Sequence, residues 1–464
     1  MNFSDISFFI FFILFVLLYY LFNDAASQNK FTFISSLLFY SFWDWRFLSL
    51  LLFSTSMDYL IGLRVRNNRK LLSLSFFINF ATLGFFKYFN FFVTSFSDLL
   101  DLINIPYQIS TLKIILPIGI SFYTFQSFSY VFDIAYKKIN PEKDFITFGC
   151  FVTFFPQIIA GPIERANNII PQLKLKRIVN LDNIMMGCSL VLLGLAKKIL
   201  ISDYLAIYVN KGFDPGNSGI EFLNFNSLST FLVILAFTFQ IYLDFSSYTN
   251  IARGIGKVLN IKLVKNFNYP YLSKDFHSFW SRWHMSLTSW FKDYLYIPLG
   301  GNRISELVTQ RNVLIVFVVS GLWHGANYNF LIWGFLHGCF YIVENLKFLK
   351  RFTNHSLWRF ISMFLIIILW GIFRAEGPTH AYLMFLNILK FSSEGLNILN
   401  NHFLYVLILS FIFICLEKQI VKYGYKISAR MPQFPVRCGI IFTVLFSIIF
   451  MFQGEVNEFV YFQF

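Results

Sequence analysis

Long apolar segments recur along almost the whole chain, and they constrain its fold more than any other feature of the sequence. A helix needs about 20 apolar residues to cross the hydrocarbon core of a bilayer. About a dozen segments approach that length, with loose ends: 6–23, 31–43, 46–63, 71–95, 112–132, 184–209, 227–250, 313–326, 328–346, 357–374, 403–416 and 437–453. The pattern predicts an all-α polytopic membrane protein.

The composition excludes the soluble alternatives. Only 13% of the residues are charged and 56% are hydrophobic, whereas a soluble domain carries about 25% charged residues. A disordered chain, a secreted disulfide scaffold and an ordinary cytosolic enzyme are therefore not expected. The five cysteines are scattered without CxxC spacing, so the sequence predicts neither a zinc site nor a disulfide framework.

The net charge of +14 is best explained by membrane topology. Cytoplasmic loops of membrane proteins collect Lys and Arg, so no nucleic-acid partner is expected. The basic loops are 64–70, 137–143, 165–177, 253–265, 303–311, 347–351 and 418–437. Most of them can lie on the cytoplasmic face if the N-terminus is outside.

Two apolar stretches differ from ordinary spans. Residues 145–163 are interrupted by Pro156, Gly161 and Pro162, and residues 276–291 are amphipathic. We expect both to be re-entrant or interfacial, because broken backbone at membrane depth must be shielded by protein. No long loop or repeat divides the chain, which predicts one membrane domain over residues 1–464.

Pro117 and Gly119 lie inside another predicted span, where a helix kink is the expected consequence.

A histidine stands near the end of the apolar segment 313–326. As a helix this segment would be about 21 Å long, which is short of a core about 30 Å thick. We therefore expect His324 to lie inside the membrane profile. Gly321 and Gly325, which have no side chains, lie on either side of it and allow another molecule to approach closely. An imidazole can take a proton from a hydroxyl near neutral pH; the alternative is a hydrogen-bonded core histidine.

The segment 276–291, FHSFWSRWHMSLTSWF, has apolar residues at helical spacing. On a wheel of about 100° per residue, Trp283 lies in the apolar arc, Arg282 in the polar arc, and His277 and His284 near the seam between them. A histidine at the seam can face a water-filled cavity. The alternative is a tryptophan-rich interfacial helix with incidental histidines.

Three acidic residues lie inside apolar runs: Asp58, Asp133 and Asp244. Buried carboxylates are costly unless they are paired, so we expect structural ion pairs or helix caps. The candidate partners are Lys87, Lys197, Arg253 and Lys257.

Several other chemistries have no motif in this chain. There is no Walker A loop, Rossmann glycine fingerprint, GxSxG elbow or HExxH sequence. The seven histidines lack metal-ligand spacing with nearby Cys or Glu, so we predict no metal site.

The two histidine motifs carry a resemblance to a known family. FWSRWHMSLTSWFKDYLYIPLGGNR (279–303) and SGLWHGANYNFLIWGFLHG (320–338) closely resemble the membrane-bound O-acyltransferase family. The similarity is to its bacterial polysaccharide branch, typified by the membrane subunit of alginate O-acetyltransferase. Further stretches that fit the branch are 39–62, 115–133, 154–165, 240–261, 370–377 and 460–464.

The resemblance implies a fold and a set of site residues. The fold would be a ring of about 11–13 tilted transmembrane helices, with re-entrant or interfacial helices, around a central channel. His324 would be the catalytic histidine and His284 the second one. The residues expected to line the channel or position substrate are Trp323, Asn327, Trp283, Arg282 and Asp244. Ser281 stands where the family has a basic residue, which weakens the case for a phosphate contact there.

The resemblance also implies an activity. It implies acetyl transfer from a cytoplasmic thioester, either acetyl-CoA or an acyl carrier, with no bound cofactor. His324 would act as general base or carry the acyl group transiently. The protein would lie among the lipids of a bacterial inner membrane and serve O-acetylation of a polysaccharide or cell-wall glycan, through a periplasmic partner transferase.

Three alternatives stay open at this point. One is D-alanyl transfer to teichoic acid from a carrier protein. The others belong to different classes: a polysaccharide or lipid exporter without acyl chemistry, and a passive scaffold that recruits the periplasmic enzyme.

Overall fold

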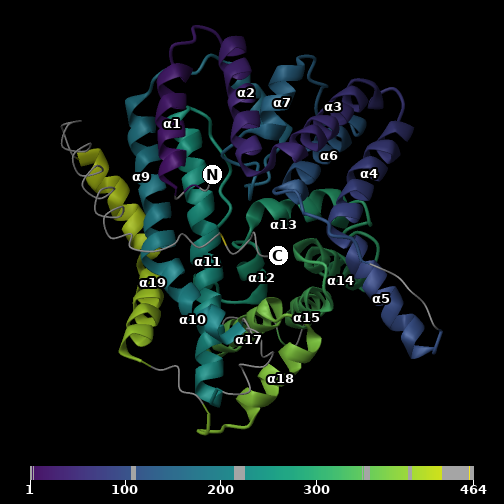
Figure 1. The fold of residues 1–464 in the computed structure, drawn as a ribbon, viewed down its shortest axis with the longest axis vertical. Coiled ribbons are helices and arrows are strands. Elements are labelled where there is room, and N and C mark those ends of the chain that lie inside the picture. Colours follow the sequence, from purple (N-terminus) through teal and green to yellow (C-terminus); the bar gives the residue numbers. More distant parts are fainter. Residues whose placement is uncertain are drawn as a thin grey trace. The chain divides into compact units, whose positions relative to one another are not determined.

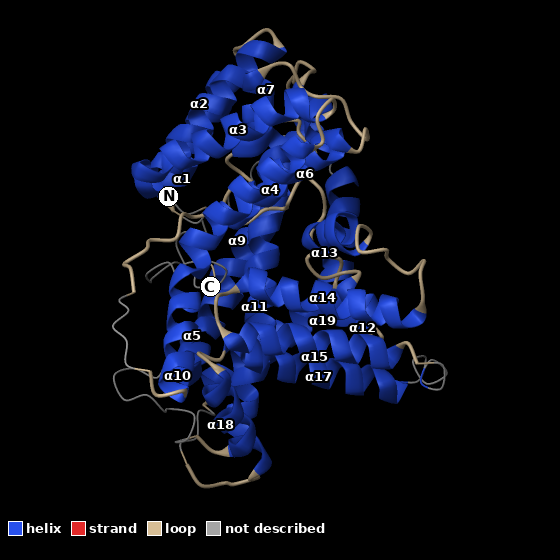
Figure 2. Cartoon of the chain, turned by 90° about the vertical axis from the view of Figure 1, so that its right-hand side faces the viewer, coloured by secondary structure: helices blue, strands red, loops and turns tan. Residues whose placement is uncertain are grey.

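The computed structural model describes residues 5–105, 111–213, 225–346, 356–395 and 400–430, together with Phe3, Leu349 and Phe459. These residues form helices and loops with no β-strand (Figure 2). Seven helical segments among them are long and apolar enough to cross a membrane. The prediction of an all-α polytopic protein is confirmed, while the predicted span 437–453 lies outside the described residues.

The chain packs as two compact units. Unit 1 comprises Met1–Ile184 and Gly256–Val264, and unit 2 comprises Met185–Ile255 and Lys265–Phe464. Helices α9 (Leu181–Lys197) and α11 (Ser227–Val258) each have residues in both units. That the two units form a single domain stays a prediction.

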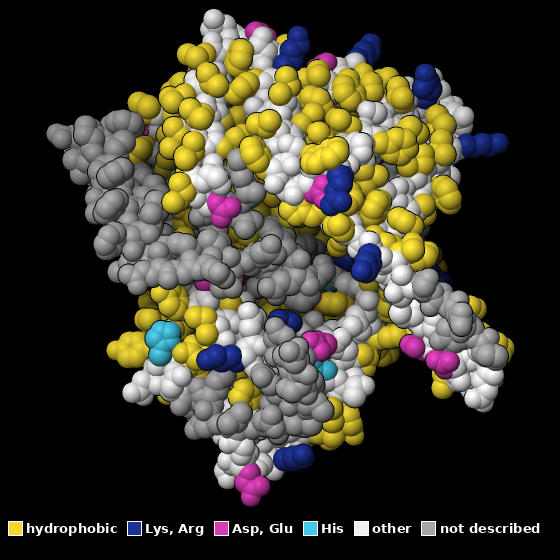
Figure 3. Space-filling model, in the orientation of Figure 1, with side chains coloured by type: hydrophobic (Ala, Val, Ile, Leu, Met, Phe, Trp, Pro, Cys, Tyr) yellow, Lys and Arg dark blue, Asp and Glu magenta, His cyan; other side chains and the backbone are white. Residues whose placement is uncertain are grey.

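Unit 1 is built around a buried helix, α6 (Ile120–Ala135), in which every residue is buried. Its other helices are α1 (Ile6–Tyr19), α2 (Ala25–Asp44), α3 (Leu48–Val65), α4 (Lys70–Leu83), α5 (Phe89–Leu102), α7 (Phe145–Thr153) and α8 (Ala166–Leu173). Helices α3, α4 and α7 pack against α6 (Figure 1). On the face shown in Figure 3, exposed apolar side chains are spread widely over this unit, as expected for a surface in contact with lipid.

Helix α6 begins later than the apolar pattern predicts. Gly119 lies before its first residue with φ of 74°, and a Cβ there would stand 2.2 Å from the Ile158 carbonyl oxygen. Only glycine fits this left-handed conformation and close approach without strain. The glycine therefore starts a helix, and the expected kink inside a continuous span is wrong. In the predicted broken segment 145–163, α7 ends at Thr153 and the chain continues without regular helix, as expected.

The basic loops of unit 1 meet at one end of it. Arg66 donates to Asn140 Oδ1 at 2.7 Å, which joins the α3–α4 loop to the α6–α7 loop. Lys174, after α8, pairs with Glu142 at 2.6 Å. The Tyr20 hydroxyl donates to the Val258 carbonyl oxygen at 2.6 Å, so the C-terminal end of α1 lies at this same end of the unit. Helix α1 therefore begins at the opposite end from the basic loops.

Arg177 holds that end of unit 1 together. The residue is 2% exposed, and its guanidinium donates to the Tyr19 hydroxyl, to Asn29 Oδ1 and to the carbonyl oxygens of Leu173 and Leu175, at 2.7 to 2.9 Å. The planar fork of an arginine reaches acceptors in several directions, which a lysine ammonium cannot reproduce. The side chain thus ties α1, α2 and the segment after α8 to one another.

We expect Arg177→Lys to lower the free energy of unfolding by about 1.5–3 kcal/mol, because buried acceptors lose charged donors. Thermal unfolding in detergent measures the effect. Lys176→Arg, at the exposed neighbouring position, is the matched control and should leave the unfolding temperature unchanged. Equal unfolding temperatures for the two variants would contradict the structural role of Arg177.

Two of the acidic residues singled out by sequence lie in unit 1. Asp133, near the end of α6, pairs with Lys138 at 3.2 Å. Asp58 accepts hydrogen bonds from Ser75 Oγ at 2.6 Å and from Asn79 Nδ2 at 2.8 Å. Among the described residues, neutral donors thus satisfy a carboxylate for which the sequence predicts an ion pair or cap.

Unit 2 carries the histidine motifs. Besides most of α9 and α11, its helices are α10 (Asp203–Phe213), α12 (Phe276–Trp280), α13 (Met285–Phe291), α14 (Glu306–His324), α15 (Tyr328–Glu344), α17 (Ser356–Arg374), α18 (Pro378–Leu389) and α19 (Asn401–Arg430). Helix α14 has 19 residues, or about 28 Å at 1.5 Å per residue. It is longer than the predicted 313–326, so the expectation of an unusually short span is wrong. His324 is its last residue.

Helices α14 and α15 form a hairpin that glycine makes possible. A Cβ on Gly321 would lie 2.1 Å from the Phe330 carbonyl oxygen, and one on Gly334 would lie 2.3 Å from the Phe317 carbonyl oxygen. The two backbones therefore touch, as at small-residue helix interfaces in membranes. The glycines of the motif bring the two helices into contact directly beside His324.

Candidate active site

A cavity of about 710 Å³ runs along one face of α14. Its lining residues on this helix are Glu306, Thr309, Gln310, Val313, Val316, Phe317, Ser320 and His324. At 100° per residue they fall within an arc of about 120°. From Glu306 to His324 the face is about 27 Å long. The cavity is therefore a groove that follows the helix and reaches His324 at its end.

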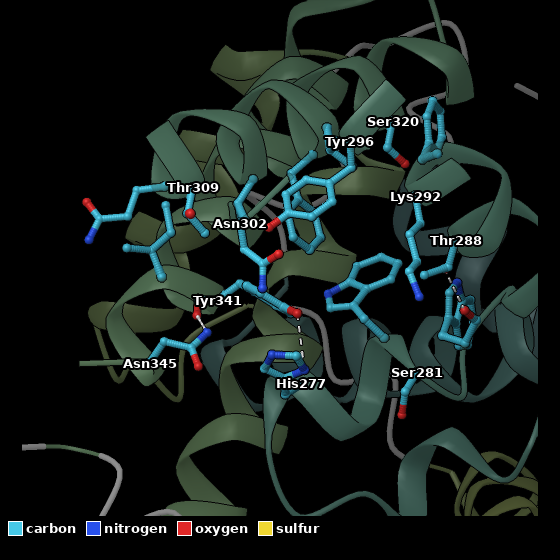
Figure 4. Close-up of a pocket in the computed structure, with 18 of the residues that line it drawn as sticks. His277, Ser281, Thr288, Lys292, Tyr296, Asn302, Thr309, Ser320, Tyr341 and Asn345 are labelled. Atoms are coloured by element: carbon cyan, nitrogen blue, oxygen red, sulfur yellow. Dashed lines mark hydrogen bonds between the residues drawn. The ribbon is translucent and has the colours of Figure 1, made fainter. Parts of the chain in front are cut away.

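The other walls of the groove come from α12, α13, α15 and the segment after α13. Trp280, Trp283, His284 and Leu287 line it from the tryptophan-rich segment. Tyr341 and Asn345 line it from α15 and its end, and Lys292, Tyr296 and Asn302 line it from the segment after α13 (Figure 4). The groove thus brings His324 and His284 to one cavity.

His324 is held by aromatic rings at the end of α14. It is 7% exposed, and its ring centroid lies 5.0 Å from Trp323, 5.5 Å from Trp333 and 5.2 Å from Phe373. Gly325 follows it in extended conformation and ends the helix. A Cβ at Gly325 would lie 2.0 Å from the Phe330 ring. The sharp end of the helix leaves the imidazole at the groove.

Asn329 is a buried residue that the sequence did not single out. Its Nδ2 group lies 2.6 Å from the carbonyl oxygen of Ala375 and 3.2 Å from that of Ile372, at the end of α17. Helix ends leave carbonyl groups without partners, and a side-chain amide here supplies donors. Asn329 thereby fastens α17, which carries Phe373, beside His324. Its place in the WHGANYN motif was the available signal.

His284 lies at a break between two helices. Helix α12 ends at Trp280, and His284 precedes α13 with φ of 42° and ψ of 53°. The prediction of a continuous amphipathic helix over 276–291 is therefore wrong, and so are the positions of its histidines on one wheel. A non-glycine residue in the left-handed region is uncommon and points to a local constraint.

The imidazole of His284 lies in an apolar setting. The side chain is 1% exposed, and its ring lies 4.8 Å from Phe245 and 6.0 Å from Trp323. Neither ring nitrogen has a hydrogen-bond partner in another described residue. Because burial disfavours the charged ring, the pKa of His284, which is outside the candidate spans, falls to about 3. His284 is therefore neutral and can exchange hydrogen bonds with a ligand in the groove.

We expect His284→Asn to fold like the wild type, since asparagine tolerates the left-handed conformation, and to lose most of the transfer activity. His284→Val is β-branched and should unfold at a lower temperature, because the backbone strain is about 1–3 kcal/mol. Thermal unfolding and a transfer assay on both variants separate the two effects. If valine and asparagine give the same unfolding temperature, the left-handed backbone is not a constraint.

Of the remaining predicted site residues, two lie at the groove or beside the histidines and three have side chains that do not line the groove. Trp283 lines the groove, and Trp323 contacts both histidines without lining it. The side chains that do not line the groove are those of Arg282, Asn327 and Asp244. The Asn327 side chain donates to the Glu376 carbonyl oxygen at 2.5 Å, and the backbone carbonyl oxygen of Arg282 accepts from the Asn268 N–H at 2.9 Å.

Asp244 belongs to a buried ionic cluster instead. It pairs with Lys198 at 2.8 Å, and Lys198 also pairs with Asp203 at 2.9 Å. Lys197, a candidate partner by sequence, pairs with Glu417 of α19. The Tyr242 hydroxyl donates to the same carboxylate at 2.5 Å. These contacts link α9, α10, α11 and α19, which is a structural role of the kind expected for Asp244 as an ion pair.

No group of three or more His, Cys, Asp or Glu side chains that could hold a metal occurs within the described part of the chain.

Fold and groove together define a polytopic membrane protein with two buried histidines at one end of an elongated cavity. A model of the membrane-bound O-acyltransferase family matches residues 141–373. The chain is 36% identical over 407 residues to the probable alginate O-acetylase of Pseudomonas aeruginosa, covering 86% of this chain and 76% of that protein. It is 37% identical over 406 residues to the peptidoglycan O-acetyltransferase of Helicobacter pylori, covering 78% and 73%.

A more distant match is the teichoic acid D-alanyltransferase of Bacillus subtilis, 25% identical over 253 residues, covering 52% of this chain and 61% of that protein. The chain belongs to the membrane-bound O-acyltransferase family and is an acyltransferase. The resemblance drawn from the two histidine motifs is confirmed.

Proposed function

We propose that this protein takes an acetyl group from a cytoplasmic thioester and passes it across the bacterial inner membrane for O-acetylation of a surface polysaccharide or cell-wall glycan. The observation that carries the proposal is the groove along α14. It connects both histidines with the start of α14, where Arg303 and Arg311 lie. A donor entering there would present its acyl end at His324.

The chemistry follows from the two imidazoles. His324 takes the proton of an acceptor hydroxyl, whose oxygen attacks the thioester carbonyl carbon. The C–S bond breaks, and the thiolate receives the proton from His324. Acyl group and proton thus exchange places, and no other reactant is needed. His284, neutral in the same cavity, is placed to donate a hydrogen bond to the thioester. A transient acyl group on His324 stays an alternative route.

The orientation is supported by unit 1. Its basic loops meet at one end, and α1 begins at the other. The positive-inside rule favours a cytoplasmic location for the basic end, which supports a proposed topology with the N-terminus outside. Arg303, before α14, and Arg311, in its second turn, are basic as well, and the same rule supports a cytoplasmic entrance of the groove.

The acceptor and partner are supported by the relatives. An alginate O-acetylase and a peptidoglycan O-acetyltransferase match most of this chain, whereas the D-alanyltransferase matches about half of it. This difference favours acetyl over D-alanyl transfer. We include in the proposal a periplasmic transferase as the partner that completes modification of the glycan, with the donor being acetyl-CoA or an acyl carrier.

The test uses protein reconstituted in vesicles with the basic loops outward. Labelled acetyl thioester is added outside, and a glycan acceptor with the candidate partner transferase is enclosed inside. Labelled ester on the enclosed glycan is the expected result. Thioester that stays intact in the presence of acceptor and partner would contradict the proposal and favour an exporter or a scaffold.

A further inference from the structure

The polarity of the groove changes along its length. On α14, His324 is followed by Ser320, then by an apolar stretch of Phe317, Val316 and Val313, and then by Gln310, Thr309 and Glu306. A ligand that matches this pattern has a reacting end, a short apolar section and a polar section. A fully apolar ligand, such as a lipid-linked acyl carrier, does not match it.

A hydrogen-bonded pair lies beside the apolar stretch of α14, next to Phe317. His277 of α12 and Tyr341 of α15 both line the groove, with His277 Nδ1 and the Tyr341 hydroxyl 3.1 Å apart (Figure 4). Their ring centroids are 4.3 Å apart, and Tyr341 lies 5.5 Å from Phe317. The pair thus connects two walls of the groove at the level of Phe317.

Other groups that can form hydrogen bonds line the same part of the groove. Asn302 and Asn345 contribute amides, and Tyr296 a hydroxyl (Figure 4). The Asn345 amide also donates to the Tyr341 carbonyl oxygen at 2.9 Å, which fixes its place next to the pair. Donors and acceptors of this kind recognise amide groups in a ligand.

The distance to the reacting end selects the ligand class. Phe317 and His324 are seven positions apart on α14, or about 10 Å. The thioester arm shared by coenzyme A and acyl carrier proteins is pantetheine, which contains two amides. Its second amide nitrogen is eight bonds from the acyl carbon, and an extended chain advances about 3.5 Å per three bonds, or roughly 9 Å. With the acyl carbon at His324, the second amide reaches Tyr341.

We propose that His277 and Tyr341 recognise the second amide of a pantetheine thioester and thereby decide which thioesters this groove accepts. The inference rests on the proposed function, and it adds a specificity-determining pair to it. The Tyr341 hydroxyl exchanges a hydrogen bond with the amide, and His277 orients that hydroxyl. Neither side chain touches the reacting atoms, so their effect is on donor binding and not on the chemical step.

The experiment compares two acetyl donors of equal length with purified protein. One is S-acetylpantetheine, and the other is the S-acetyl ester of a methoxy-oligo(ethylene glycol) thiol, which has no amide. Initial rates of thiol release are measured at fixed acceptor. We expect Tyr341→Phe to raise KM for S-acetylpantetheine about three- to tenfold, the effect of one lost hydrogen bond, with kcat unchanged and with no change for the amide-free donor.

Tyr405→Phe is the matched control, because the same hydroxyl is removed from a side chain that is 70% exposed and outside the groove. His277→Phe keeps a ring beside Tyr341 and should reproduce the Tyr341→Phe effect in weaker form. A KM that is unchanged for both donors, or raised equally for both, overturns the proposal. Unfolding temperatures show that the variants are folded.

Failure of the proposed function gives a different result. In that case the wild type releases no thiol from either donor, or His324→Ala releases it at the wild-type rate. Acetyl-CoA and an acetylated carrier protein, tested as further donors, identify the source of the arm. Because both contain pantetheine, the Tyr341→Phe change in KM is expected for whichever of the two is turned over.

Discussion

Replacing His324 by alanine is expected to slow acyl transfer about 10²- to 10⁴-fold, the usual contribution of a general acid–base group. The residue is the last one of α14, it lines the groove, and three aromatic rings hold it there. Alanine is a good helix former and should leave α14 intact. Transfer of labelled acetyl in reconstituted vesicles measures the rate, and thermal unfolding measures the stability.

His402→Ala is the matched control for that experiment. His402 is an exposed histidine of α19, away from the groove, and forms a 2.7 Å hydrogen bond with Tyr208. We expect it to transfer acetyl at the wild-type rate. A folded His324→Ala protein with full transfer activity would sink the catalytic role and leave the groove without its reacting group.

Replacing Gly321 by alanine is expected to damage both stability and activity. The new Cβ would stand 2.1 Å from the Phe330 carbonyl oxygen and 3.4 Å from the Cα of Gly334, so the hairpin must open. Overpacking of this kind costs about 1–3 kcal/mol. Because His324 follows three residues later on the same helix, a shift of α14 also moves the imidazole, and we expect transfer to fall at least tenfold. The unfolding temperature and the transfer rate are the two measurements.

Gly84→Ala is a sensitive control for that substitution. Gly84 is helical, and a Cβ there would meet nothing within 4 Å. Alanine is favoured over glycine inside a helix by about 0.5–1 kcal/mol. We therefore expect Gly84→Ala to unfold at the wild-type temperature or above. The close-approach argument fails if Gly321→Ala and Gly84→Ala behave alike.

Much of the fold could be predicted because few backbone conformations are stable inside a membrane. Backbone groups without water must bond to one another, so a long apolar segment becomes a helix. The segments 227–250 and 357–374 correspond to α11 and α17 for this reason. Helix ends were less predictable. The pattern misses the first turns of α14, since the polar residues from Glu306 to Asn312 can still be helical.

The site was harder to predict than the fold. The WHG and RWH motifs located both histidines, and Gly321 was singled out beside His324, but its contact with the Phe330 carbonyl oxygen was not predicted. Nothing local predicted that His284 takes a left-handed conformation, because such a conformation in a non-glycine residue is imposed by its surroundings. Tyr341 carried no signal in the sequence, whereas Asn329 lies in the WHGANYN motif and His277 in the tryptophan-rich segment, but neither motif shows what these side chains contact. Their roles depend on what lies opposite them, which hydropathy does not report.

By itself the sequence determined that the protein lies in a membrane, that it is helical and which family it belongs to. Apolar segment length and the paired histidine motifs are local properties, so they can be read without the tertiary structure. The tertiary structure decided which polar groups meet. It pairs Asp244 with Lys198, supports His324 through Asn329, and aligns one face of α14 into a groove. The physical reason is that an apolar side chain faces lipid and protein interior equally well. Only packing distinguishes a lipid-facing residue from one that lines a site.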